Sequence, residues 1–117
     1  MYARIALPRN RAVDRCEHFE QIRDVVPSAR GCEDCIRIGD TWNELRICLT
    51  CGHVGCCDDS NNQHASKHFQ ATQHPLIKSF DPGETWGWCY IDKLYFKDMP
   101  DGAGGKRRNF LQRLFSR

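Results

Sequence analysis

Residues 48–52 read Cys-Leu-Thr-Cys-Gly, and a second pair of cysteines with the same spacing, Cys32 and Cys35, precedes them. Two cysteines in one tight turn, followed by a glycine that relaxes the φ requirement of that turn, are typical of a zinc knuckle. Three histidines follow downstream, at positions 64, 68 and 74. A disulfide framework does not need histidines, whereas a tetrahedral zinc site uses both kinds of ligand. The pattern therefore predicts structural zinc.

The composition agrees with a small domain that needs a metal ion to fold. The chain has 117 residues, with 8 cysteines and 5 histidines, and a chain of this length has only a thin core of its own. No apolar run is long enough to span a membrane, and the N-terminus lacks the apolar segment of a secretory signal. We therefore expect a cytoplasmic location, where thiols stay reduced and bind metal.

Hydrophobic patterning predicts an α+β fold, a short antiparallel sheet with one main helix after the knuckle. Strands are expected over residues 42–49 and 54–57, and the helix over about 62–72, before Pro75. Ala65, Phe69 and Ala71 form the expected buried stripe of this helix. Residues 76–80 and 86–91 are expected to pair with each other across a turn, and residues 94–96 to continue the second of these strands.

The predicted domain covers residues 16–98 and lies between two basic ends. Residues 1–15 are expected to form a flexible arm, and residues 99–117 a glycine-rich tail with a short helix. The net charge is +2, and the basic residues of the ends include Arg4, Arg9, Arg11, Arg15, Lys106, Arg107, Arg108, Arg113 and Arg117. Such runs are solvated in some proteins and contact nucleic acid or membranes in others. A nucleic-acid-binding zinc domain is therefore the alternative function, although no recognition helix stands out.

A catalytic zinc site is disfavoured. His64 and His68 lie four residues apart on the expected helix, so both point to one side. This resembles half of the HExxH motif of metalloproteases, but residue 65 is alanine and supplies no general base. The chain also has enough nitrogen and sulfur donors to close every metal site, whereas a catalytic zinc keeps one open position. We therefore expect no enzyme activity and assign no catalytic residue.

A longer series of positions resembles one family. The series comprises Cys32, Cys35, Trp42, Leu45, Cys48-Leu49-Thr50-Cys51-Gly52, Cys56, residues 64–69, residues 72–75 and Trp88-Cys89-Tyr90. It is similar to the UBP-type zinc finger, a module that occurs in ubiquitin-specific proteases and in a cytoplasmic histone deacetylase. The resemblance runs from Cys16 to about Asp92, and the chain looks most like the small stand-alone versions found in bacteria.

The resemblance implies how the ligands are divided. One site would use Cys32, Cys35, Cys56 and His64, and a second, interleaved with it, would use Cys48, Cys51, His68 and His74. A third family site would use Cys16, His18, Cys89 and a cysteine where this chain has Asp92. A carboxylate also ligates zinc, so the third site is either retained with Asp92 or lost, and the Cys16–His18 pair favours retention. Two zinc ions are thus expected, a third stays open, and Cys57 receives no ligand role.

The resemblance also implies a binding surface. Family members that bind ubiquitin hold its C-terminal tail among aromatic side chains, with an arginine on the terminal carboxylate. Asp58 stands where that arginine is expected, and it would repel a carboxylate. The candidate partner-binding residues are Trp88, Tyr90, Trp42 and, as a replacement cation, Arg46; core packing is the alternative role of the aromatics. We therefore predict a zinc-binding, non-catalytic protein-interaction module whose partner is a protein or peptide C-terminal tail, with ubiquitin itself disfavoured.

Overall fold

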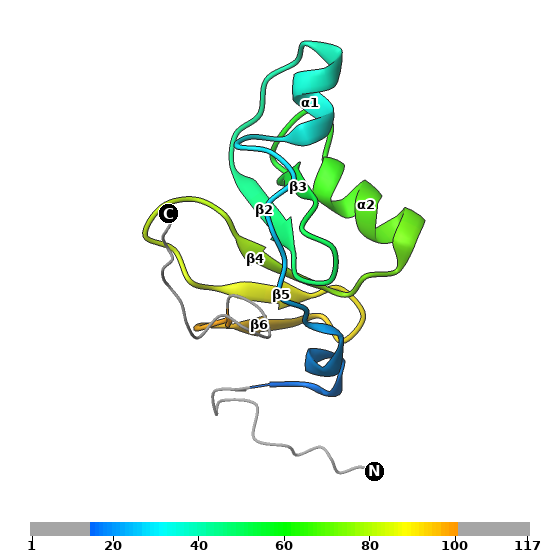
Figure 1. Cartoon of the computed structure of the whole chain (residues 1–117), viewed down its shortest axis with the longest axis vertical. Helices are drawn as coiled ribbons and strands as arrows, with labels where there is room; N and C mark the ends of the chain where they lie inside the picture. Colours follow the sequence, from blue (N-terminus) through cyan, green and yellow to red (C-terminus); the bar gives the residue numbers. More distant parts are fainter. Residues whose placement is uncertain (1–14, 101–117) are drawn as a thin grey trace.

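Eight short elements make up residues 15–100, the part of the chain that this computed structural model describes. Most of the predicted arm and the tail beyond residue 100 lie outside the described residues. The elements (Figure 1) are the 3-10 helix η1 (Glu17–Gln21), α1 (Glu33–Ile38), β2 (Leu45–Cys48), β3 (Val54–Cys56), α2 (His64–Thr72), β4 (Leu76–Ser79), β5 (Gly87–Cys89) and β6 (Leu94–Phe96). None of the helices in the described part is long and apolar enough to cross a membrane.

The five strands form one antiparallel sheet in the order β3-β2-β4-β5-β6. This confirms the predicted α+β fold. The two strands after Pro75 pair as predicted, with Ile77 opposite Trp88. Residues 94–96 do not continue β5, which corrects the prediction. The chain turns back where Lys93 has a φ of 57°, and β6 pairs antiparallel with β5. This turn contains no glycine or proline that would mark it in the sequence.

The predicted helix is α2, and it begins at His64 because Gln63 has a left-handed backbone with a φ of 50°. Ala65 is buried, but Ala71 is exposed, so the buried stripe is shorter than predicted. The sequence does not predict α1, which has only six residues and starts inside the first Cys-x-x-Cys pair. A helix of that length shows no clear hydrophobic period.

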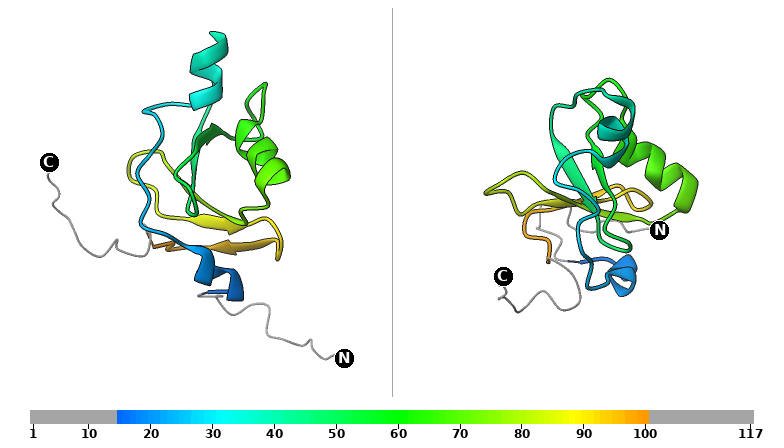
Figure 2. Two further views of the ribbon diagram at one scale, coloured as in Figure 1. Left: turned by 45° about the vertical axis from the view of Figure 1, so that its right-hand side comes forward. Right: turned by 45° about the horizontal axis from the view of Figure 1, so that its top comes forward.

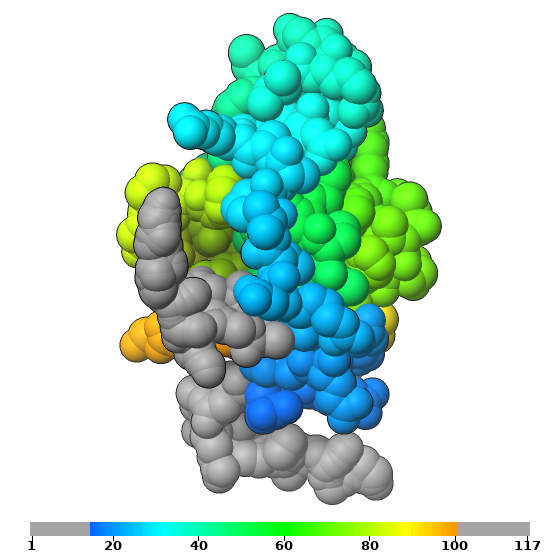
Figure 3. Space-filling view, in the orientation of Figure 1, coloured from blue at the N-terminus to red at the C-terminus, as the bar shows by residue number. Residues whose placement is uncertain are grey.

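The N-terminal segment packs on the sheet. Phe19 of η1 meets Phe96 of β6 edge to face, with ring centroids 5.0 Å apart, and Leu76 and Phe96 are almost completely buried. Figure 2 places η1 beside β5 and β6 and α1 at the other end of the domain. Figure 3 shows the segment between η1 and α1, coloured blue to cyan, as a band across the surface. Met99, one residue beyond the predicted domain boundary, is buried in the same core.

Helix α2 packs closely on β3 at Gly55. A Cβ atom at this position would lie 2.8 Å from the backbone nitrogen of Ala65, so the glycine permits the close approach of helix and strand. The approach brings His64, the first residue of α2, to Cys56 in β3. The backbone N–H of His64 donates a hydrogen bond to the Cys56 sulfur, with 3.2 Å between nitrogen and sulfur.

We expect Gly55→Ala to lower the free energy of unfolding by about 2 kcal/mol, because the added methyl group collides with backbone atoms of α2. Ala71→Ser, an exposed change on the same helix, should alter it by less than about 0.5 kcal/mol. Chemical denaturation of the full chain in the presence of zinc measures both changes. Equal denaturation midpoints for Gly55→Ala and the unchanged chain would contradict this account of the packing.

Candidate metal centres and binding surface

Three groups of side chains each bring four metal-binding atoms within 4.8 Å of one another. The first cluster is Cys32, Cys35, Cys56 and His64; the second is Cys48, Cys51, His68 and His74; the third is Cys16, His18, Cys89 and Asp92. Seven of the eight cysteines belong to these clusters, and all eight are free thiols. The structure thus brings together each set of four residues that the family resemblance implies.

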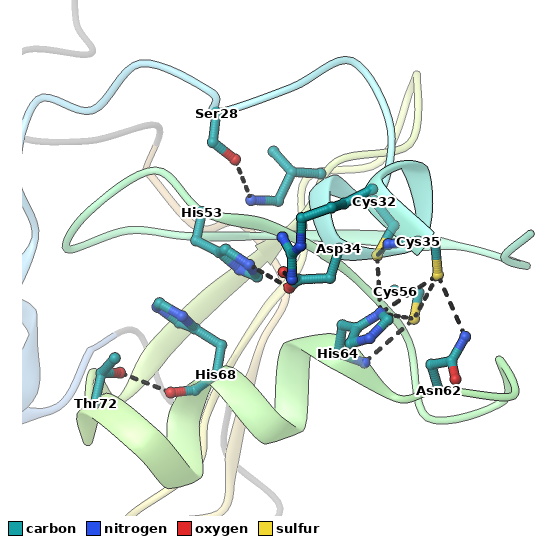
Figure 4. A network of polar contacts seen from close by, with 12 residues as sticks. Ser28, Cys32, Asp34, Cys35, His53, Cys56, Asn62, His64, His68 and Thr72 are labelled. Carbon is teal, nitrogen blue, oxygen red and sulfur yellow. Dashed lines mark hydrogen bonds and ion pairs between the residues drawn. The ribbon is translucent and has the colours of Figure 1, made fainter. Parts of the chain in front are cut away.

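The first cluster joins α1, β3 and α2 (Figure 4). The His64 Nδ1 atom lies 3.2 Å from the sulfur of Cys32, 3.3 Å from that of Cys35 and 3.6 Å from that of Cys56. All three cysteines are fully buried. The Asn62 amide donates a hydrogen bond to the Cys35 sulfur over 3.6 Å. Such N–H donors stabilise the negative charge of a thiolate in a buried site.

The second cluster joins the knuckle between β2 and β3 to His68 in the middle of α2 and to His74, which follows the helix. The His68 Nε2 atom lies 3.3 Å from the Cys51 sulfur, and the His74 Nδ1 atom lies 3.6 Å from the Cys48 sulfur. Gly52 ends the knuckle with a φ of 88°, and a Cβ atom there would collide with a backbone oxygen. The knuckle therefore requires glycine at this position for both conformation and space.

The third cluster ties the N-terminal segment to the turn between β5 and β6. The His18 Nδ1 atom lies 2.9 Å from a carboxylate oxygen of Asp92, 3.5 Å from the Cys89 sulfur and 3.8 Å from the Cys16 sulfur. Burial by itself raises the pKa of Asp92, but hydrogen bonds from Cys16 and His18 bring this pKa below its ordinary value. The carboxyl group is therefore ionised, which is the form that ligates a metal ion.

The donor atoms of the first cluster are spaced as tetrahedral zinc requires. Bonds of about 2.3 Å to sulfur and about 2.0 Å to nitrogen place neighbouring donors about 3.5 to 3.8 Å apart around the ion. The first cluster has the same spacing within a few tenths of an ångström. Burial raises the pKa of Cys16 and of Cys32 to about 12 and that of Cys48 to about 11. A zinc ion must therefore displace protons from these thiols when it binds.

His53, to which the sequence assigns no role, connects the first two clusters. Its Nε2 atom lies 2.9 Å from a carboxylate oxygen of Asp34, which stands between Cys32 and Cys35. Its ring stacks on that of His68, with centroids 4.2 Å apart and planes 4° from parallel. Figure 4 shows this chain of contacts from Asp34 to His68. His53 thus orients the His68 ring of the second cluster while it is itself held by Asp34 of α1, the helix that carries Cys35 of the first cluster.

A hollow of about 280 Å³ lies beside α2, and we call it the aromatic hollow. It is lined by Arg46, Cys57, Asp58, Asp59, Ile77, Trp86, Trp88 and Tyr90. Three of the four predicted partner-binding residues therefore lie together here. The fourth, Trp42, does not line the hollow and instead packs over Gly31, where no Cβ atom would fit beside its ring.

Helix α2 supports one wall of the aromatic hollow. The Tyr90 ring stacks on Phe69, with centroids 4.7 Å apart. The Ser66 hydroxyl donates a hydrogen bond of 2.6 Å to the Asp58 carboxylate, and it also lies 3.4 Å from the Tyr90 hydroxyl. These contacts fix Tyr90 and Asp58 side by side.

Arg46 is the cation of the hollow, and its charge has partners within the chain. Its guanidinium donates a 2.8 Å hydrogen bond to the Leu45 carbonyl and pairs with Glu44 at 3.2 Å and with Asp81 at 3.5 Å. It also lies over the Trp86 ring, 4.5 Å from the centroid. A ligand carboxylate would have to compete with two carboxylates of the protein for this guanidinium.

Comparison with known proteins identifies the family. A family profile described as "Zn-finger in ubiquitin-hydrolases and other protein" matches residues 32–100. The chain belongs to this zinc-finger family. The resemblance seen in the sequence is therefore confirmed, and zinc is the cofactor that the clusters of this UBP-type zinc finger are suited to hold.

Relatives of this zinc finger differ widely in length. The chain is 32% identical over 111 residues to ubiquitin carboxyl-terminal hydrolase 44 of Ailuropoda melanoleuca, and the match covers 89% of the chain but 15% of the hydrolase. It is 36% identical over 69 residues to the NAD-dependent deacetylase sir2A of Dictyostelium discoideum, covering 59% of the chain and 12% of the deacetylase. A Rhodopseudomonas palustris protein solved by solution NMR is 50% identical, with a TM-score of 0.68 over 83% of this chain and 99% of that one.

We expect His53→Ala to weaken zinc binding at the second cluster by about tenfold, because His68 loses the ring that holds its orientation. His53→Phe keeps a ring for stacking but loses the contact with Asp34. Its zinc affinity should therefore lie between those of the unchanged chain and His53→Ala. Competition with a chromogenic chelator measures the affinities. Identical affinities in all three proteins would show that the stack does not position His68.

Acid should weaken the zinc finger in a defined pH window. Burial lowers the pKa of His68 from 6.5 to about 4. The unfolded chain takes up a proton at His68 below pH 6.5, whereas the folded chain does so only near pH 4, so folding becomes less favourable as the pH falls through this window. Protons also compete with zinc for the thiolates. We expect zinc release, followed with a zinc-sensitive dye, and a lower melting temperature at pH 4 than at pH 7; full zinc retention at pH 4 would refute this.

Proposed function

We propose that this protein is a non-catalytic protein-interaction module in which zinc holds the scaffold and the aromatic hollow binds a peptide segment of a partner. One observation carries the proposal. Trp88 and Tyr90 line a hollow at the surface and are half-buried, although aromatic side chains in small domains usually complete the core. Recognition sites combine such apolar walls with a few fixed polar groups, which here are Arg46, Asp58 and Asp59.

We further propose that each of the three clusters binds one zinc ion, with Asp92 as the fourth ligand of the third. Each cluster offers four donors, which closes a tetrahedral site and leaves no position for a substrate. This supports a structural role for the metal and no enzyme activity. Because the clusters need reduced thiols, a reducing compartment such as the cytoplasm suits the protein.

The charged residues of the hollow limit the kinds of peptide that it can bind. Hydrolase 44 is named for the ubiquitin carboxyl terminus, and the family resemblance suggests a C-terminal tail as the ligand. In this chain Asp58 stands where an arginine is expected, and Arg46 is paired with Glu44 and Asp81. We therefore propose a peptide ligand other than the ubiquitin tail. Nucleic-acid binding, the second function suggested by the sequence, depends on the basic ends, which lie almost entirely outside residues 15–100.

We expect no binding of ubiquitin at millimolar concentration, because Asp58 would repel the terminal carboxylate and Arg46, which lines the hollow, is already paired with Glu44 and Asp81. Titration of the isotope-labelled, zinc-loaded chain with ubiquitin, with and without its last two glycines, measures this by chemical shift. Asp58→Arg is the matched variant and should gain affinity for intact ubiquitin only. Shifts at Trp88 and Tyr90 that depend on the two glycines in the unchanged chain would contradict the expectation.

We expect Cys51→Ser to unfold much of the domain, because the knuckle loses a thiolate ligand. Asp92→Ala should leave the fold in place and lower the zinc count from three to two. Native mass spectrometry measures the stoichiometry, and circular dichroism measures the fold. An unchanged spectrum for Cys51→Ser, or three zinc ions bound to Asp92→Ala, would contradict the ligand assignment.

A further inference from the structure

The charges at the aromatic hollow are mostly negative. Asp58 and Asp59 line it, and both are exposed. Arg46 is the cation among the lining residues, and it is paired with two further carboxylates, those of Glu44 and Asp81. The hollow and the two carboxylates paired with Arg46 thus bring together one guanidinium and four carboxylates, so this surface carries a net negative charge at neutral pH.

The hollow already holds one cation on an aromatic ring. The Arg46 guanidinium lies 4.5 Å from the centroid of Trp86, and Tyr95 stacks on the same indole with centroids 5.8 Å apart. A cation over an aromatic face, with carboxylates beside it, gains both cation–π and ionic stabilisation. The position of Arg46 thus indicates that this surface stabilises a cationic group placed over an aromatic ring. Trp88 and Tyr90 supply the other aromatic walls.

Asp58 is held in position to meet a ligand. The Ser66 hydroxyl donates to one of its carboxylate oxygens at 2.6 Å, which fixes the carboxylate next to Tyr90. Within residues 15–100 the second oxygen of this exposed carboxylate accepts no hydrogen bond, so it can meet a ligand donor. The next residue, Asp59, also lines the hollow and adds a second carboxylate.

We propose that the aromatic hollow binds the side chain of a lysine in a partner peptide, with the ammonium at Asp58 and Asp59 and the methylene stem against Trp88 and Tyr90. The proposal rests on the proposed function and names the chemistry of its ligand. Lysine carries three donors and a compact charge at the end of an apolar stem. This combination matches an acidic end and aromatic walls in one hollow.

Two other charged groups of a peptide fit less well. An N-terminal ammonium has no apolar stem, and a polar peptide group follows it directly, which the aromatic walls would leave without hydrogen bonds. A C-terminal carboxylate would meet Asp58 and Asp59 with a charge of the same sign.

The test is an NMR titration of the isotope-labelled, zinc-loaded full chain with short peptides. The main probe is Gly-Gly-Lys-Gly-Gly blocked at both ends. Three comparison probes are the same peptide with acetylated lysine, pentaglycine with a free amino terminus, and pentaglycine with a free carboxyl terminus. The indole N–H signals of Trp86 and Trp88 report on the hollow. We expect the lysine peptide to shift them and the other three to bind at least about tenfold more weakly.

Variants locate the binding. Asp58→Asn and Asp59→Asn should each weaken the lysine peptide by about tenfold, because each removes a charge-assisted partner of the ammonium. Asp24→Asn, which removes an exposed carboxylate from the N-terminal segment, is the matched control and should have no effect. Zinc content and circular dichroism establish that each variant is folded.

The outcomes separate the two proposals. Equal binding of the lysine and acetyl-lysine peptides, or no effect of either aspartate variant, overturns the lysine proposal. Preference for the amino-terminal or carboxyl-terminal peptide also overturns it, but leaves peptide binding at the hollow intact. If none of the four peptides shifts Trp86 or Trp88, the lysine proposal and the proposed function of the hollow both fail.

Discussion

The structure depends on clusters of candidate metal ligands that come from segments far apart in the chain. The first two clusters alternate along the sequence, and α2 supplies His64 to one and His68 to the other. The third cluster ties His18 to Asp92, 74 residues later. Ions held in this way close long loops, and their binding free energy becomes folding free energy. The strands of the sheet have only three or four residues. Metal binding would therefore supply folding free energy that the thin core does not.

Contacts outside the clusters fix the positions of the histidine side chains within them. The stack of His53 on His68 and the contact of His53 with Asp34 connect the second cluster to α1, which carries Cys35 of the first. The close approach of α2 to β3 at Gly55 sets the position of His64 beside Cys56. The first two clusters and α2 therefore form one packed unit, joined by side-chain contacts through His53.

This packed unit also supports the aromatic hollow. Tyr90 rests on Phe69 of α2, and Asp58 is held by Ser66 of the same helix. The helix that donates ligands to two clusters is thus the helix that supports one wall of the aromatic hollow. A site that is organised before binding loses little conformational entropy when a ligand arrives. The zinc scaffold and the proposed recognition of a peptide are connected through α2.

Spacing along the sequence determined the zinc chemistry, because the Cys-x-x-Cys turns and the two histidines of α2 are local patterns whose geometry follows from the backbone. Local patterning likewise predicted α2 and the pairing of β4 with β5. Only the tertiary structure decided the role of His53, the position of Trp42 away from the hollow and the pairing of Arg46 with Glu44 and Asp81. Asp81 lies 35 residues beyond Arg46 in the sequence, and the antiparallel pairing of β2 with β4 brings the two together. Contacts of this kind depend on strand order and side-chain packing, which residue spacing does not encode.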